Sequence, residues 1–130
     1  MIVALADTSY FVALVNARDE MHEAATRQSI RRDIRLVTTL WILTELADGF
    51  CKPPWRALVK GLIDQLLTDP DVEVVGASEE VFEAAWQLFG RRPDKDWSLT
   101  DCTSFVIMQR RGLTDALTGD HHFEQAGFRA

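Results

Sequence analysis

The sequence predicts an α/β fold, a three-layer sandwich with helices on both faces of a central, mainly parallel sheet of four to five strands. Short apolar runs alternate with longer amphipathic segments along the whole chain. The apolar runs lack the alternation of a half-exposed strand, which is typical of strands buried on both faces. Helix caps and turn residues separate the segments, and alternating strands and helices favour a parallel sheet.

The predicted strands are short and each is followed by a helix or a turn. The first is the apolar run at residues 2–6, and the others lie at 35–38, 72–75 and 115–118. One helical turn at 123–128 and a short final strand complete the chain. We see no repeat or linker, and 130 residues suit one domain covering residues 1–130.

Local signals define the predicted helices. Thr39, Ser78 and Ser98 are suited to N-terminal caps, Pro54 can begin a helix, and Gly112 fits a C-terminal cap. The helices are predicted at residues 10–15, 19–32, 40–49, 55–68, 78–90 and 98–111.

Composition excludes several classes of protein. Hydrophobic residues make up 47% of the chain and charged residues 26%, which suits a soluble globular protein and argues against disorder. No apolar stretch approaches the ~20 residues that span a bilayer, and the start lacks the features of a signal peptide, so we expect no membrane partner. Two cysteines without metal-ligand spacing favour a reducing, cytoplasmic location.

The net charge of −6 argues against broad electrostatic binding to nucleic acid. The basic residues are clustered, however, in three groups that are also typical of solvated helix ends. These groups are Arg31, Arg32 and Arg35, then Arg91, Arg92 and Lys95, then Arg110 and Arg111.

Four acids stand at the edges of apolar segments: Asp7, Glu45, Asp101 and Asp120. An ionised carboxylate beside buried surface costs several kcal/mol unless it is paired or binds a cation. Asp7 and Asp120 directly follow strands, and the other two lie within helices that follow the second strand and the Arg-rich loop. Ligands of such sheets bind beyond the carboxyl ends of the strands, so we expect all four acids at one edge.

Each acid also has a structural explanation. Asp7 is suited to cap a helix, and Asp101 forms a capping-box pattern with Ser98. Glu45 can point to solvent, and Asp120 can turn the chain after Gly119. Four such coincidences together are much less probable than one, which favours a divalent metal site.

Four stretches resemble the PIN-domain nucleases, specifically VapC-type toxins of bacterial toxin–antitoxin pairs. The stretches are Asp7-Thr8-Ser9, Thr44-Glu45-Leu46, residues 96–102 (DWSLTDC) and residues 117–123 (LTGDHHF). The resemblance implies a PIN-like fold and a Mg²⁺- or Mn²⁺-dependent endoribonuclease with the four acids as its catalytic site. It also implies an RNA substrate, an antitoxin partner and a homodimer.

The chemistry of the acids agrees with this resemblance. Hard divalent cations prefer carboxylate and water oxygens, and such ions activate water for attack on a phosphodiester. We expect Asp7 and Asp101 to be the principal ligands, with Asp120 and Glu45 holding ligand waters or a second ion.

Other residues are secondary candidates. Asp96 is either a fifth carboxylate or a solvated loop residue, and Ser9 and Thr118 are suited to bond ligand carboxylates or phosphate. RNA phosphates are a candidate ligand for Lys95, Arg91 and Arg92. Adjacent histidines do not share a helix face, so His121 and His122 are not expected to bind metal. We expect Trp41, Trp86 and Trp97 in the core or half-buried.

Three rival functions are less well supported by the sequence. One is a catalytically weak PIN scaffold that serves as a protein- or RNA-binding module. The second is a receiver-like signalling domain, which needs an Asp after the third strand; here residues 72–75 run into Gly76-Ala77-Ser78. The third is a metal-dependent phosphatase, for which Asp7-Thr8-Ser9 lacks a second carboxylate.

Overall fold

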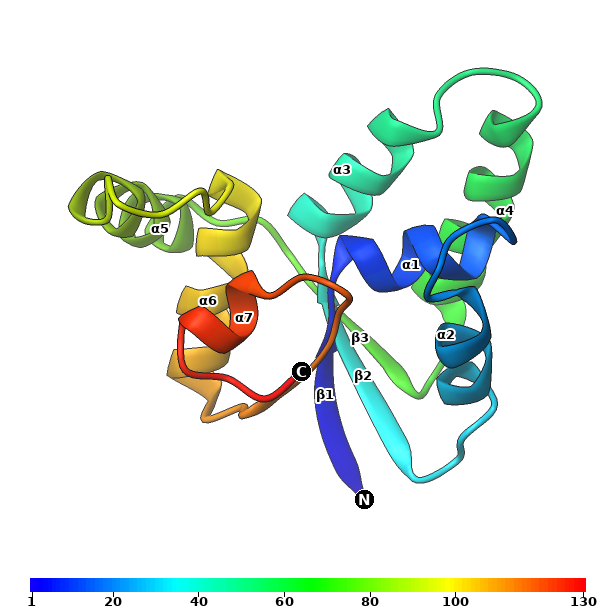
Figure 1. The fold of residues 1–130 in the computed structure, drawn as a ribbon, viewed down its shortest axis with the longest axis horizontal. Coiled ribbons are helices and arrows are strands. Elements are labelled where there is room, and N and C mark those ends of the chain that lie inside the picture. The colour runs from blue at the N-terminus through cyan, green and yellow to red at the C-terminus, as the bar shows by residue number, and fades with distance from the viewer.

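The computed structural model describes residues 1–130 and contains one parallel sheet between layers of helices (Figure 1). The strand order is β3-β2-β1-β4, so β1 lies inside the sheet and its neighbours come from distant parts of the chain. The strands are β1 (Ile2–Ala6), β2 (Ile34–Thr39), β3 (Val72–Val75) and β4 (Asp115–Leu117). The predicted α/β class is confirmed, with four strands.

Helices cover both faces of this sheet. Figure 1 shows α1, α2 and α4 on one side, α5, α6 and α7 on the other, and α3 leaving the sheet at the carboxyl end of β2. The helices are α1 (Thr8–Val15), α2 (His22–Ser29), α3 (Leu40–Gly49), α4 (Trp55–Thr68), α5 (Glu79–Arg91), α6 (Leu99–Arg111) and α7 (His122–Gln125). None of them combines the length and hydrophobicity that a bilayer crossing requires.

The core lies between β1 and the two helical layers. Leu5, Phe11, Ile42, Leu46 and Phe123 are almost completely buried in one cluster. Burying each such side chain stabilises the fold by about 1.5–3 kcal/mol. This packing holds the carboxyl end of β1 in place, which is where the first acid of the sequence analysis lies.

The predicted caps are formed. Thr39 Oγ1 accepts a hydrogen bond from the N–H of Ile42 at 3.1 Å, and Ser78 Oγ accepts one from the N–H of Val81 at 3.2 Å. At the end of α6, Gly112 has φ = 66°, a left-handed conformation that glycine adopts without steric cost.

Two predicted elements are wrong in extent. The helix predicted at 19–32 is the shorter α2, because the Asp19 carboxylate accepts the N–H of Met21 at 2.9 Å and holds a turn before the helix. The final strand is reduced to a single bridge between Asp115 and Arg129.

Trp86 is exposed, contrary to the prediction of a core or half-buried side chain. Helix α5 packs through Ala85 and its neighbours, whereas Phe82, Trp86 and Phe89 form a stripe that is 43%, 53% and 42% exposed. The rings of Trp86 and Phe89 stack at 5.5 Å. Trp97, in contrast, is buried as predicted.

Candidate active site

The four predicted acids line one hollow of about 590 Å³ beside the carboxyl ends of β1 and β4. They come from four separate parts of the chain: Asp7 before α1, Glu45 in α3, Asp101 in α6, and Asp120 in the turn before α7. The topology therefore brings together residues that lie far apart in sequence.

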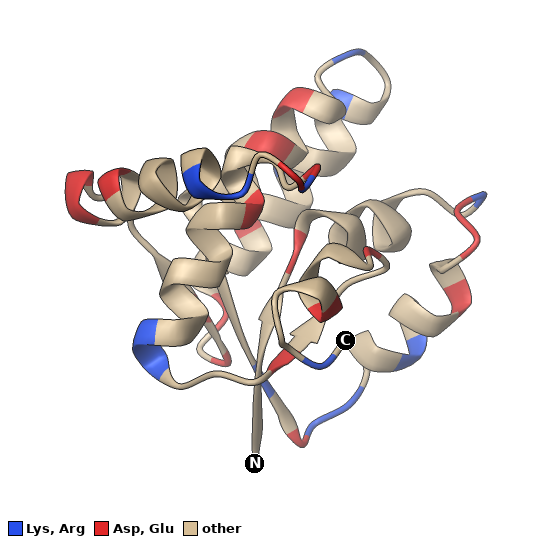
Figure 2. Ribbon diagram, turned by 60° about the vertical axis from the view of Figure 1, so that its left-hand side comes forward, with Lys and Arg blue, Asp and Glu red and all other residues tan.

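Two of the basic clusters lie far from this hollow. Figure 2 shows Lys and Arg gathered at the end of α6 and around the start of β2, near the N-terminus of the chain. This is the opposite end of the sheet from the acids.

Asp7 is only 3% exposed and makes no side-chain bond to cap α1. Its Oδ2 instead accepts hydrogen bonds from Ser9 Oγ at 3.1 Å and from Thr118 Oγ1 at 3.0 Å. Burial, helped by the nearby charge of Asp101, raises the pKa of Asp7 to about 6. The helix-cap explanation therefore does not account for this carboxylate.

Asp101 completes the predicted capping box of α6. Its N–H donates to Ser98 Oγ at 2.9 Å, and its Oδ2 accepts the N–H of Ser98 at 3.0 Å. The side chain still borders the hollow, and burial together with the charge of Asp120 raises its pKa. The structural role and a role in metal binding are compatible because Oδ1 makes no hydrogen bond within the chain.

Asp120 turns the chain, as its structural explanation predicted, and also faces the hollow. Its Oδ1 accepts the N–H of His122 at 2.9 Å, and its own N–H donates to Thr118 Oγ1 at 3.0 Å. Thr118 therefore links Asp120 to Asp7.

His122 is a site residue that the sequence analysis missed. Its Nδ1 lies 3.0 Å from Asp101 Oδ2 and 3.0 Å from Asp120 Oδ2. The argument about helix faces concerned metal binding and did not address a contact between the ring and the acids, which the Asp120 turn at the start of α7 produces. A turn-forming Asp two residues before a histidine was the available clue. Ligand atoms of Asp120, His121 and His122 all lie within 4.8 Å of one another.

Glu45 is half-buried in α3 and borders the hollow. Its carboxylate forms no hydrogen bond or ion pair with another residue, although it lies beside the buried residue Leu46. An acid in this position is available to bind a cation or a water molecule.

The secondary candidates divide into two groups. Ser9 and Asp96 border the hollow, and Ser9 and Thr118 bond Asp7 as described. Arg91, Arg92 and Lys95 do not line it. Arg92 is held by Asp94 at 3.0 Å and lies over the ring of Trp97 at 5.1 Å, so RNA contact by this loop stays a prediction.

The donor set fits a hard divalent cation. Within the chain, Oδ1 of Asp7, Oδ1 of Asp101 and both oxygens of Glu45 make no side-chain hydrogen bond, whereas the Oδ2 atoms are held by protein donors. Carboxylate oxygens fixed on one side and available on the other suit Mg²⁺ or Mn²⁺, which take oxygen ligands and retain waters.

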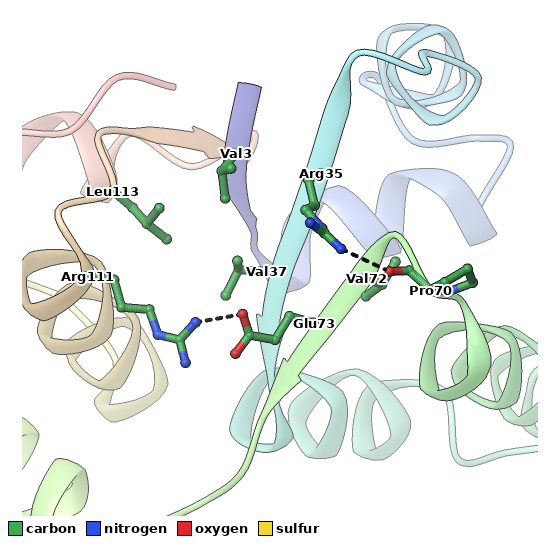
Figure 3. Close-up of a pocket in the computed structure, with 8 residues that line it drawn as sticks. All are labelled: Val3, Arg35, Val37, Pro70, Val72, Glu73, Arg111 and Leu113. Atoms are coloured by element: carbon green, nitrogen blue, oxygen red, sulfur yellow. Dashed lines mark hydrogen bonds and ion pairs between the residues drawn. The ribbon is translucent and has the colours of Figure 1, made fainter. Parts of the chain in front are cut away.

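A second hollow, of about 690 Å³, is larger but chemically different (Figure 3). Its floor includes Val3 and Val37, and its charged residues pair within the chain: Arg111 donates to Glu73 at 2.7 Å, and Arg35 reaches the carbonyl of Pro70 at 3.4 Å. Because its one carboxylate is paired with Arg111 and two arginines line it, this hollow does not suit a cation.

Comparison with known proteins assigns the chain to one family. The sequence matches the PIN domain family over residues 4–129. The chain belongs to the PIN-domain family. A relative, the 23S rRNA-specific endonuclease VapC20 of Mycobacterium tuberculosis, is 34% identical over 125 residues, which cover 94% of this chain and 92% of the relative.

Solved structures agree with this assignment to the PIN-domain family. The crystal structure of Mycobacterium tuberculosis VapC20, described as a sarcin–ricin loop cleaving toxin, superposes with a TM-score of 0.86 at 25% identity, covering 97% of this chain and 95% of that one. VapBC2 from Rickettsia felis, bound to a promoter DNA fragment, gives 0.69 at 13% identity, covering 97% and 94%. DNA-bound VapBC from Salmonella typhimurium gives 0.67 at 16%, covering 99% and 96%. The last two show the fold alone.

Proposed function

We propose that this PIN-domain protein is a divalent-metal-dependent endoribonuclease and the toxin of a toxin–antitoxin pair. One observation carries the proposal: four acids from separate elements line one hollow, and each principal candidate keeps an unbonded oxygen there. The relationship to VapC20, named as an rRNA endonuclease, supports it. A buried Asp7 with a raised pKa also supports a catalytic site over a scaffold without catalysis, because such shifts cluster at functional sites.

The residues have separate roles in the proposed reaction. Asp7 and Asp101 would hold the ion, while Asp120 and Glu45 would hold and orient water. Ser9 and Thr118 keep the Asp7 carboxylate oriented. When bound, Mg²⁺ or Mn²⁺ polarises the phosphodiester and lowers the pKa of the attacking water.

The substrate class is RNA, and the relatives suggest the first molecule to test. VapC20 is named as specific for 23S rRNA and as cleaving the sarcin–ricin loop. We propose a structured ribosomal RNA loop as the substrate of this chain, which places its activity in the cytoplasm. Lys95, Arg91 and Arg92 are the proposed contacts to RNA phosphates on the loop before α6.

Two protein partners are part of the proposal. VapBC complexes among the structural neighbours support a cognate antitoxin. The second partner is another copy of the chain, supported by the exposed aromatic stripe of Phe82, Trp86 and Phe89 on α5. Light scattering should show a dimer for the wild type and a monomer for Trp86→Ser.

Cleavage of RNA by purified protein tests the proposed activity. Cleavage should require Mg²⁺ or Mn²⁺ and stop in chelator, and Asp7→Asn and Asp101→Asn should each lower the rate by roughly 100-fold or more, because each removes a ligand charge. Asp64→Asn is the matched control, since Asp64 lies on the surface of α4 beside Lys60. Undiminished cleavage in chelator, or by both site variants, contradicts the proposal.

A further inference from the structure

His122 ties together two acids that belong to different elements. We propose that it is a positioning residue that holds Asp101 of α6 and Asp120 of the β4–α7 turn toward one ion. This inference rests on the proposed function, because it assumes that Asp101 binds a metal and that Asp120 holds water at the same ion. It adds a residue that belongs to none of the four acidic positions.

The geometry places one ring nitrogen between two carboxylates. His122 Nδ1 is 3.0 Å from Oδ2 of Asp101 and 3.0 Å from Oδ2 of Asp120. Only 16% of the His122 side chain is exposed, against 9% for Asp101 and 29% for Asp120. Ionised carboxylates accept hydrogen bonds and do not donate them, so Nδ1 carries the hydrogen that it donates to Asp101, with Asp120 at ion-pair distance from the same atom.

These contacts leave the two oxygens of Asp101 with different roles. His122 and the N–H of Ser98 occupy Oδ2 of Asp101 and leave its Oδ1 unbonded. Asp120 is held at both oxygens by His122, through the backbone N–H at 2.9 Å and through the ring. The carboxylates are therefore oriented before an ion arrives. Outer hydrogen bonds of this kind typically contribute 10–100-fold to metal affinity.

The neighbouring histidine lacks these contacts and provides a control. The side chain of His121 is 71% exposed, and its Nδ1 lies 3.7 Å from Asp120 Oδ1, beyond hydrogen-bond distance. It has the same chemistry as His122 one residue away, but it does not reach Asp101. A substitution there should leave the orientation of the two acids unchanged.

The test measures Mn²⁺ affinity without RNA, by electron paramagnetic resonance of free Mn²⁺. His122→Ala and His122→Leu both remove the donor, and Leu keeps more of the packing volume; each should weaken Mn²⁺ binding by roughly 10–100-fold. His122→Asn should bind within roughly threefold of wild type, because its amide can place an N–H near the position of Nδ1. His121→Ala should match the wild type.

A double-mutant cycle separates positioning from general damage. If His122 acts through the acids, His122→Leu should cost much less Mn²⁺ affinity in an Asp120→Asn background than in the wild type. Thermal unfolding of each metal-free variant verifies that the fold persists.

Three outcomes overturn the inference. Wild-type Mn²⁺ affinity in both His122→Ala and His122→Leu, with metal-dependent cleavage intact, rejects it and leaves the proposed function standing. Equal losses in His122→Asn and His122→Leu mean that the imidazole itself binds the ion. A wild-type protein that binds no Mn²⁺ rejects the proposed function as well.

Discussion

Asp7 illustrates how a proposed metal ligand destabilises the protein that carries it. The side chain is nearly fully buried next to Asp101, and two hydroxyl donors replace the water that it loses. The raised pKa, about 6, shows that these bonds do not compensate for burial and repulsion. In the absence of metal, the ionised form is therefore an unfavourable feature of the folded state.

Asp7→Asn should stabilise the metal-free protein at pH 7. An unfolded Asp titrates near 3.9, so raising the folded pKa to about 6 means that stability falls as pH rises from about 4 to 6. The difference corresponds to about 3 kcal/mol above that window and vanishes below it. Denaturant unfolding in chelator should show Asp7→Asn more stable than wild type at pH 7.5 and similar at pH 3.5. Equal stability at both pH values contradicts the burial argument.

Thr118→Val should raise the pKa of Asp7 further. The Thr118 hydroxyl donates to Asp7 Oδ2 at 3.0 Å and accepts the N–H of Asp120, so valine removes a donor from the charged form and an acceptor from the turn. We expect a loss of about 1–3 kcal/mol in unfolding free energy and an upward shift in the carboxyl titration, followed by NMR.

Thr8→Val is the matched control for that experiment. Thr8 also borders the hollow, but its Oγ1 is buried without a hydrogen-bond partner. Replacing this hydroxyl by a methyl group removes no bond within the chain, so the pKa of Asp7 and the stability should change little. A shift as large as that of Thr118→Val would show that local packing, rather than the hydrogen bond, sets the titration.

At the level of single elements, α6 shows how much local sequence can determine. Ser98, Asp101 and Gly112 predicted both of its ends, and the structure contains the capping box and the left-handed residue. The ends of α2 were not predictable in the same way, because its polar sequence has no comparable cap and a turn held by Asp19 competes with the helix. Trp86 was misjudged because amphipathic spacing does not show which face of a helix has a neighbour.

Gly112→Ala should destabilise the protein by about 1–2 kcal/mol. The position has φ = 66°, which costs an L-residue with a Cβ that amount, while no atom lies within 4 Å of an added Cβ. The penalty is therefore conformational rather than steric crowding. Gly112→Asn should cost less, because asparagine tolerates this region. Denaturant unfolding distinguishes the two, and equal losses contradict this explanation.

For the molecule as a whole, the order of the strands assembles the site. Strand β1 pairs with β2 on one side and with β4 on the other, where Leu5 lies opposite Ala116, so Asp7 and Asp120 meet at one edge.

 Ser9 and Thr118, which flank these acids and stand 109 positions apart in the chain, lie 2.9 Å from each other there. Asp7 and Asp120 were predictable at this edge because both directly follow strands of a parallel sheet. His122 was not, because its contact with Asp101 depends on how the β4–α7 turn packs on α6.

Metal binding should stabilise the whole protein by linkage. An ion that binds only the folded state, at 100 times its Kd, adds about 2.7 kcal/mol, and it also relieves the repulsion among the acids. Thermal unfolding should therefore show a higher Tm for the wild type in Mn²⁺ than in chelator. Asp64→Asn, on the surface of α4, should keep this increase, and Asp101→Asn should lose most of it.

Asp7→Asn should change stability in opposite directions without and with metal, because it removes both a buried charge and a proposed metal ligand. Without metal this variant is expected to be more stable than the wild type at pH 7, because it lacks the buried charge whose pKa is raised to about 6. In saturating Mn²⁺ it should become the less stable protein, because it has lost the ligand through which the ion stabilises the fold. Tm measured for both proteins across a Mn²⁺ titration tests this reversal. Parallel curves that never cross would mean that the charge of Asp7 is not used to bind the ion.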